Sequence, residues 1–192
     1  MKKIAFLTSF ALAVLIFQQP NLFAADVDAR AIGVITGHYA PRNFAAGSVS
    51  RTDLDKILSA AVRAPSASNR QPWHFTVVQD QNLTKQIVSN ITDGNILIVI
   101  SGPGDSKTNG AVMLDCGLAT QSIYLAAQSL GLGSRIYTGP IDALNSKLKA
   151  DLGLPSGYSA VALVRIGRLP AGADAVSGAS TRKALNDLVT YK

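Results

Sequence analysis

The sequence predicts one α+β domain in which helices cover a β-sheet. Three observations support this prediction. Several stretches repeat apolar residues with helical spacing, short apolar runs rich in Val and Ile lie between them, and the connections are short. The chain has 192 residues, which is enough for one compact domain with its own core. No internal repeat or long linker divides it.

The first 25 residues are typical of a secretory signal peptide. Lys2 and Lys3 make a basic start, residues 4–17 are almost wholly apolar, and the stretch 22–25 offers the small Ala24 and Ala25 for cleavage. The apolar run is shorter than the ~20 residues of a comfortable membrane span, although an uncleaved N-terminal anchor stays open as an alternative. We therefore expect an exported protein, periplasmic or secreted. Its single mature domain would comprise residues 26–192, without a stable membrane span.

Composition argues against several classes of function. Loss of Lys2 and Lys3 with the signal peptide would lower the formal net charge from +6 to +4. The charges are scattered and aromatic residues do not interleave with them, so no nucleic-acid surface is expected. Cys116 is the only cysteine, which excludes an intrachain disulfide, and its apolar neighbours predict a buried filler. One cysteine and two histidines offer few soft ligands, so a dedicated metal site is not expected.

Helical patterns recur along the whole chain. Helices are expected at 26–38, 54–62, 83–91, 108–130 and 141–152, with a short helix or turn at 182–189. Ser50 and Asp53 form the pattern of a capping box ahead of the second helix. The helix at 108–130 is apolar on nearly all sides and must be covered on all sides, in part by a second subunit. Gly131 and Gly133 supply the residues that end it.

Four strands are expected from short apolar runs, at 73–79, 95–101, 134–138 and 158–169. The run Ile-Leu-Ile-Val-Ile within 95–101 has the composition and length of a buried strand.

The most informative stretch is the polar loop between the second helix and the first strand, which reads A-P-S-A-S-N-R-Q-P-W-H-F over residues 64–75. Pro65 and Pro72 make it stiff, and a stiff polar loop on a scaffold is a common place for ligand recognition. The loop resembles the segment A-P-S-x-x-N-x-Q-P-W-x-F of the flavin-dependent nitroreductase family, with eight matching positions.

The order of elements from residue 31 onward is similar to that family. The resemblance implies a mixed, mostly antiparallel sheet between helices, in an intertwined homodimer with FMN at the subunit interface. It implies an FMN-dependent oxidoreductase that moves hydride in two steps, with NAD(P)H as a candidate donor. The small-molecule acceptor would be a nitroaromatic, a quinone or a similar electrophile. No acid or base is required, so no catalytic residue is assigned.

The resemblance also implies cofactor-binding residues before the second helix. The family segment R-R-S-x-R-x-F corresponds to residues 38–44, where Arg42 and Phe44 agree but His-Tyr-Ala at 38–40 replaces Arg-Arg-Ser. Arg42 is the candidate positive charge near the flavin edge or the phosphate, and His38 is a further candidate phosphate donor. Each uncompensated loss would weaken binding by about 1–3 kcal/mol.

In the polar loop, the resemblance implies that Ser66, Ser68 and Asn69 lie against the flavin and its ribityl chain. Asn69 would bind the ring edge, Gln71 would brace the loop, and Trp73 would anchor it in the core.

Two later segments complete the implied site. Thr138 and Gly139 would pass the flavin N5 atom, where glycine permits close approach. Arg182, with Lys183 as the weaker candidate, would contact the phosphate, although a basic pair near a C-terminus is also typical of a solvated surface.

Two alternatives to the enzyme stay open. The departures at residues 38–40 fit a non-catalytic flavin- or small-ligand-binding protein, or a structural dimeric domain with a degenerate pocket. Another branch of the same fold, performing dehydrogenation or flavin remodelling, is also open. Export raises a further question, since reduced nicotinamide cofactors are not expected outside the cytoplasm and the electron donor could differ.

Overall fold

The computed structural model describes residues 31–105, 108–173 and 182–192. The predicted signal peptide lies outside these residues, and the first predicted helix is seen only from residue 31, with residues 31–37 helical. The chain divides into two units, residues 1–36 and residues 37–192. The strands and the remaining helices belong to the second unit.

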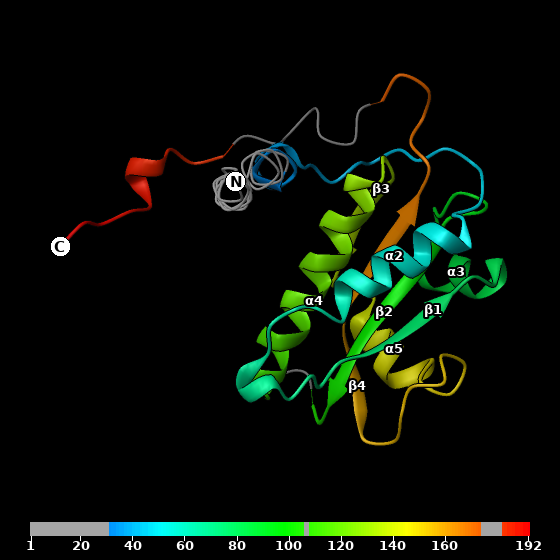
Figure 1. Ribbon diagram of the computed structural model, residues 1–192. Coiled ribbons are helices and arrows are strands. Elements are labelled where there is room, and N and C mark those ends of the chain that lie inside the picture. Colours follow the sequence, from blue (N-terminus) through cyan, green and yellow to red (C-terminus); the bar gives the residue numbers. More distant parts are fainter. Residues whose placement is uncertain (1–30, 106–107, 174–181) are drawn as a thin grey trace, which may run out of the picture. The chain divides into compact units, whose positions relative to one another are not determined.

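A four-stranded sheet forms the centre of this unit (Figure 1). Its strands are β1 (His74–Val78), β2 (Ile96–Pro103), β3 (Gly133–Tyr137) and β4 (Tyr158–Gly167), in the spatial order β1-β2-β4-β3. The three neighbouring pairs are antiparallel. The sheet formed by the described strands is therefore antiparallel throughout, whereas the resemblance implied a mixed, mostly antiparallel sheet. The α+β prediction is confirmed, and each strand lies within two residues of its predicted bounds.

The helices flank this sheet. They are α2 (Arg51–Ala61), α3 (Gln81–Ile87), α4 (Gly110–Ser129) and α5 (Ile141–Lys147), with 3-10 turns η1 (Ala67–Asn69) and η2 (Leu185–Asp187). The predicted helix at 83–91 was placed too late, because Asp80 caps α3 by accepting the Leu83 N–H at 2.8 Å. The predicted helices at 141–152 and 182–189 were too long. Hydrogen-bonded turns follow α5 as far as Leu154, and the last segment holds a single 3-10 turn.

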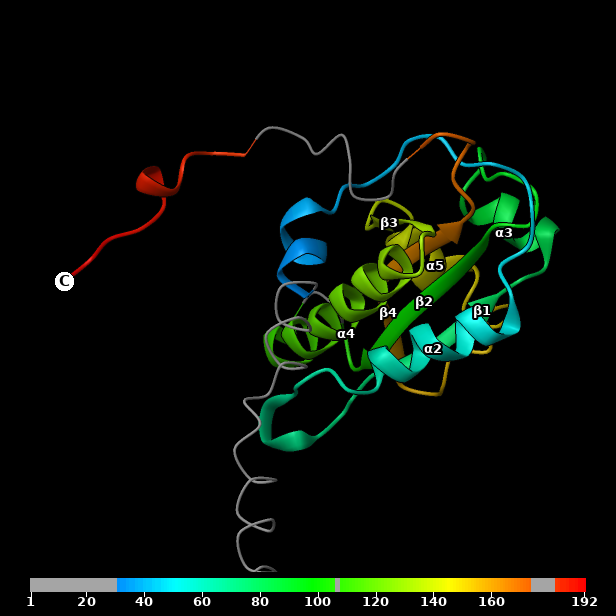
Figure 2. The same ribbon diagram turned by 45° about the horizontal axis from the view of Figure 1, so that its top comes forward.

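Alternate residues of β2 face two hydrophobic cores. Ile96, Ile98 and Ile100 pack with residues of α2 and α4, whereas Leu97 and Val99 pack with residues of α3 and α5. Figure 2 shows α2 and α4 together on one face of the sheet. Because β2 is buried on both faces, its sequence is continuously apolar rather than alternating.

α4 is the longest of the described helices and packs against β2, β3 and β4. It ends in a Schellman motif, in which the Gly131 and Leu132 N–H groups donate to the carbonyls of Gln128 and Ala127. Gly131 has a φ of +74°, as the predicted C-cap requires. The side of α4 away from the sheet leaves Met113 and Leu114 42% and 64% exposed. Within the described residues, no helix is long and apolar enough to cross a membrane.

Candidate functional site

The polar loop is fixed to α4 through a buried carboxylate. Asp115 is 1% exposed, and its Oδ1 accepts the Ala67 N–H at 3.0 Å. Its Oδ2 is buried without a hydrogen-bond partner among the described residues. The sequence analysis did not predict this role of Asp115, since its partner lies 48 residues away.

Inside the loop, short-range hydrogen bonds hold an uncommon backbone. Ser68, Asn69 and Gln71 have φ values of +53°, +53° and +48°, which non-glycine residues rarely adopt. The Ser66 carbonyl accepts the Asn69 N–H at 3.0 Å, and its Oγ accepts the Gln71 N–H at 2.9 Å. Gln71 Nε2 donates to Asn69 Oδ1 at 3.1 Å and to the Asn69 carbonyl at 3.3 Å. Gln71 therefore braces Asn69, as predicted.

The loop presents polar side chains to the surface. Ser68 and Asn69 are exposed and Ser66 is half-buried. Trp73 is only partly buried. It packs against the core and stacks on Phe75 with ring centroids 6.5 Å apart. Backbone held in a sparsely populated region by its surroundings is frequent at ligand sites.

Cys116, next to Asp115, confirms the prediction of a buried filler. Its side chain is fully buried, and Sγ lies 3.8 Å from the Ser101 carbonyl, to which the thiol donates. Burial, with a smaller contribution from the Asp115 charge, raises the pKa of the Cys116 thiol to about 11. The thiol is therefore protonated at neutral pH and unsuited to nucleophilic chemistry.

The segment of residues 38–44 lies outside helices and strands. His38 packs edge-on against Tyr124 of α4, with ring centroids 5.3 Å apart. Burial raises the pKa of Tyr124, and this is partly offset by a hydrogen bond with Gln128 and by the charge of Arg182. His38 and Arg182, both predicted phosphate contacts, thus lie within reach of the same tyrosine.

A buried arginine holds the far end of this segment. Arg165 of β4 is 2% exposed, and its guanidinium carbon lies 4.0 Å from the centre of the Phe44 ring. Its nitrogens donate to Asn95 Oδ1 and Thr92 Oγ1, each at 2.9 Å, and to the Asn90 carbonyl at 3.4 Å. Desolvation by burial lowers the pKa of Arg165. Sequence reasoning missed this network, and the one available signal was an arginine inside an otherwise apolar strand.

Thr138 and Gly139 follow the end of edge strand β3 and are exposed. The Thr138 carbonyl accepts the Ile141 N–H at the start of α5. A Cβ placed on Gly139 would meet no atom within 4 Å. Nothing in the described chain therefore requires glycine here, and space is available for a group from outside the chain.

The two candidate segments are attached to opposite ends of α4. The polar loop is bound by Asp115 and the 38–44 segment by Gln128, thirteen positions later. At 1.5 Å per residue these anchors are about 20 Å apart. The two segments are therefore anchored to the described chain at well-separated points of α4.

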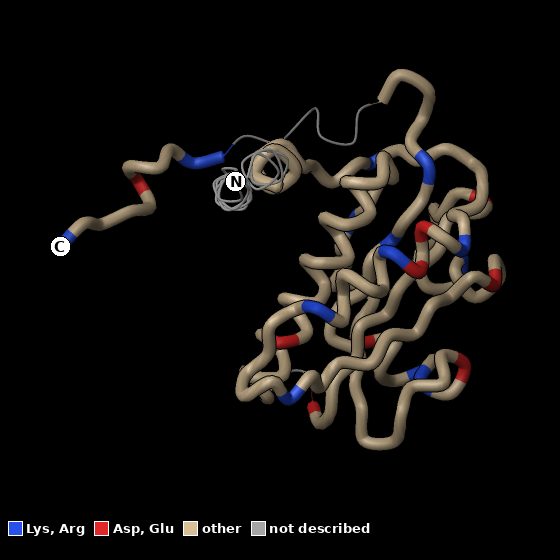
Figure 3. Tube along the Cα trace, viewed as in Figure 1, with Lys and Arg blue, Asp and Glu red and all other residues tan. Residues whose placement is uncertain are grey.

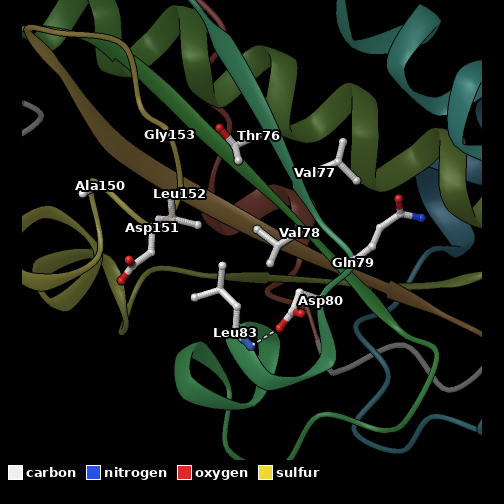
Figure 4. A pocket seen from close by; sticks show the side chains of 10 residues that line it. All are labelled: Thr76, Val77, Val78, Gln79, Asp80, Leu83, Ala150, Asp151, Leu152 and Gly153. Atoms are coloured by element: carbon white, nitrogen blue, oxygen red, sulfur yellow. Dashed lines mark hydrogen bonds between the residues drawn. The ribbon is translucent and has the colours of Figure 1, made fainter.

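A separate groove of ≈ 370 Å³ lies along the free edge of β1 (Figure 4). Val78, Leu83 and Leu152 form its apolar floor, with the acidic Asp80 and Asp151 beside them. None of the predicted cofactor residues lines it. Basic and acidic side chains are interspersed over the described chain (Figure 3), in agreement with the scattered charge of the sequence.

Comparisons with known proteins agree with this architecture. The sequence matches the profile of the Nitroreductase family over residues 35–96 and 87–168. It is 37% identical over 129 residues to an Archaeoglobus fulgidus protein assigned as an NADH dehydrogenase/NAD(P)H nitroreductase, covering 62% of this chain and 74% of that protein.

Two solved structures have similar folds. A nitroreductase with bound FMN from Desulfitobacterium hafniense has a TM-score of 0.70 at 25% identity, covering 84% of this chain and 97% of that one. An FMN-dependent nitroreductase from Clostridium difficile has a TM-score of 0.64 at 26% identity, covering 82% and 99%.

Proposed function

Because the chain belongs to the nitroreductase family, we propose that it is an FMN-dependent oxidoreductase acting on a small electrophile such as a nitroaromatic or a quinone. The observation that carries the proposal is the loop of residues 66–71. It presents exposed serine and asparagine side chains on a backbone with three positive φ values, braced from within by Gln71 and from below by Asp115.

The residues present fit the chemistry of FMN. Hydroxyl and amide groups of Ser66, Ser68 and Asn69 match a ribityl chain and a ring edge. Arg42, His38 and Arg182 are donors suited to a phosphate or to an electron-rich ring edge. Bound FMN would supply the hydride chemistry. The residues of this chain would bind and orient it, and the open space at Gly139 would admit it.

We further propose that the site is shared by two copies of the chain. The separation of the two candidate segments along α4 supports this, because each copy would contribute one segment to each site. The exposed face of α4 supports it too. Leu114 is 64% exposed, and a Cβ on Gly117 would meet no atom within 4 Å. Glycine inside a helix costs about 1 kcal/mol relative to alanine, and close approach of another helix would offset that cost.

Light scattering on the mature protein tests the dimer. We expect a dimer for the wild type, and a monomer with greatly weakened FMN binding for Leu114→Glu. The matched control is Gln86→Glu, which adds the same charge at an exposed position of α3, on the other side of the sheet. A wild type that is monomeric and still binds FMN would contradict the shared site.

A visible absorption spectrum after FMN addition and desalting tests the cofactor. We expect a retained, shifted flavin spectrum, with binding at least about 10-fold weaker in Arg42→Ala and Asn69→Ala. The control is Arg51→Ala, which removes an exposed ion pair with Asp55 within α2 and none of the candidate cofactor contacts.

Reduction of the bound flavin separates the enzyme from its alternative. Rapid bleaching by NADH, NADPH or another two-electron donor, followed by reoxidation with a quinone or nitroaromatic, is expected for the oxidoreductase. Retained flavin that no donor reduces would favour a non-catalytic flavin-binding protein. A folded protein that retains no flavin would contradict both.

We also propose export, on the basis of residues 1–25. Fractionation of cells expressing the full chain tests it. We expect a processed protein in the periplasm or medium, and retention at full length inside the cell when the apolar run is interrupted by charged residues.

A further inference from the structure

A buried amide on α4 holds the segment that carries two candidate cofactor contacts. Gln128 is 3% exposed. Its Oε1 accepts the Tyr39 N–H at 3.3 Å, and its Nε2 donates to the Tyr39 carbonyl at 3.1 Å. One side chain therefore satisfies both backbone groups of a residue 89 positions away.

The same amide is itself held in place. Gln128 Nε2 also donates to Ser134 Oγ at 3.0 Å, and Ser134 Oγ donates to the Tyr124 carbonyl at 2.8 Å. Ser134 is fully buried at the start of β3. The end of α4, the start of β3 and Tyr39 are thus joined in one buried network, in which each partner fixes the orientation of the next.

The backbone around Tyr39 has little other support. It lies in neither a helix nor a strand, so no ladder of hydrogen bonds sets its register. The Pro41 carbonyl accepts a long bond of 3.4 Å from Arg135 Nη1. His38 precedes Tyr39 directly, and the stiff Pro41 lies between Tyr39 and Arg42, so the position of Tyr39 sets where the side chains of both candidate contacts begin.

We propose that Gln128 is a positioning residue for the cofactor site, acting through the Tyr39 backbone to place His38 and Arg42. This inference rests on the proposed FMN function. Only an amide of this length can accept from the N–H and donate to the carbonyl of one residue at once. An apolar side chain would leave the partly buried N–H and carbonyl of Tyr39 and the buried Ser134 hydroxyl without this partner.

Three variants of the full-length protein test the proposal. Gln128→Met keeps the side-chain volume and removes all the hydrogen bonds, whereas Gln128→Glu keeps the acceptor for the Tyr39 N–H. Thr120→Val is the matched control. Thr120 is a buried polar residue of the same helix, and its hydroxyl donates only within α4, to the Cys116 carbonyl at 2.7 Å.

FMN titration gives the first result. We expect the dissociation constant to rise at least about 10-fold in Gln128→Met, by less in Gln128→Glu, and less than about 2-fold in Thr120→Val. The triple variant His38→Ala/Arg42→Ala/Gln128→Met should bind FMN as His38→Ala/Arg42→Ala does, because residues that act through one another are not additive. Effects that multiply, or equal losses in Gln128→Met and Thr120→Val, would overturn the positioning role.

Hydrogen exchange without flavin separates this inference from the proposed function. The Tyr39 amide should lose protection in Gln128→Met and keep it in Thr120→Val. Unchanged exchange in Gln128→Met would overturn the inference even where flavin binds normally. A wild type that binds no FMN would overturn the proposed function and, with it, a role for Gln128 at a cofactor site, whatever the exchange result.

Discussion

The loop of residues 66–71 and the segment of residues 38–44 differ in how they are held. Most hydrogen bonds of the loop link residues two to five positions apart, as between Ser66 and Gln71. The single long-range exception among the described residues is the bond to Asp115. The segment instead depends on partners 48 to 121 positions away, on β3, β4, α4 and the chain before β2.

This difference explains how the two regions respond to sequence change. A locally braced loop keeps its shape only while its own residues are kept, and its motif is intact here. A segment held through its backbone tolerates replacement of its side chains, because Gln128 binds the N–H and carbonyl of residue 39 whatever its side chain is. The His-Tyr-Ala sequence at 38–40 can therefore occupy a position where family members have Arg-Arg-Ser.

Among the predictions, removal of Arg165 should lower stability most. It should loosen the 38–44 segment and leave the 66–71 loop unchanged. In Arg165→Met, the buried Oδ1 of Asn95 and the partly buried oxygens of Thr92 and Asn90 lose a donor, and Phe44 loses its stacked guanidinium. We expect the free energy of unfolding to fall by about 2–4 kcal/mol in urea titrations. Hydrogen exchange should rise around residues 44–45 and stay unchanged in the 66–71 loop.

Arg51→Met is the control for this experiment. Arg51 is exposed and its Nε lies 2.8 Å from Asp55 Oδ1 within α2, without a bond to either region. Its loss should cost less than about 1 kcal/mol. If both variants lose equal stability, or if the loop also opens in Arg165→Met, the two regions are not independently held.

As the pH rises, stability should first be lost through the Cys116 thiol, next to the Asp115 carboxylate that binds the loop. The pKa of the Cys116 thiol is raised from 9.0 to about 11, mainly by burial and then by Asp115. Because the folded-state pKa lies above the unfolded value, this contribution to stability is fully present below pH 9 and is lost as the pH rises to about 11. The total loss is up to about 3 kcal/mol. Tyr124, near the segment, contributes in the same direction only above pH 10.

Urea titrations between pH 8 and 10 check this order. The wild type should lose stability more steeply between pH 9 and 10 than Cys116→Ala. The variant is expected to be less stable than the wild type at pH 8, through lost packing, and flatter above it. Parallel curves for the two proteins would show that the thiol does not remain protonated in the fold.

The contrast also decides what the sequence could predict. The conformations of the polar loop and of the α4 end at Gly131 depend mainly on residues close in sequence. Both could therefore be predicted from the local sequence. The ends of α3 and α5 were misplaced because a cap and following turns, rather than periodicity, decide them. The roles of Gln128 and Arg165 were not predicted. The sequence shows a polar residue in an apolar stretch but not its partner, because only the folded chain places α4 and β4 beside the 38–44 segment.

The smallest expected effect concerns the loop backbone. Ser68 has a φ of +53°, where glycine is favoured over residues with a Cβ. Ser68→Gly should therefore raise the free energy of unfolding by about 0.5–1 kcal/mol. If Ser68 contacts the flavin, the lost hydroxyl should weaken FMN binding about 2- to 10-fold. Stability and binding would then move in opposite directions, as strain kept for function implies.

Ala67→Gly gives the matched control in urea and FMN titrations. Ala67 is a neighbour in the same turn without a positive φ, and it keeps its N–H bond to Asp115 as glycine. It should lose about 0.5–1 kcal/mol through added backbone freedom. A Ser68→Gly protein less stable than the wild type would show that the loop carries no strain at this residue. Unchanged FMN affinity would remove Ser68 from the site while leaving Asn69 as the ring contact, because Asn69 is held by Gln71 rather than by Ser68.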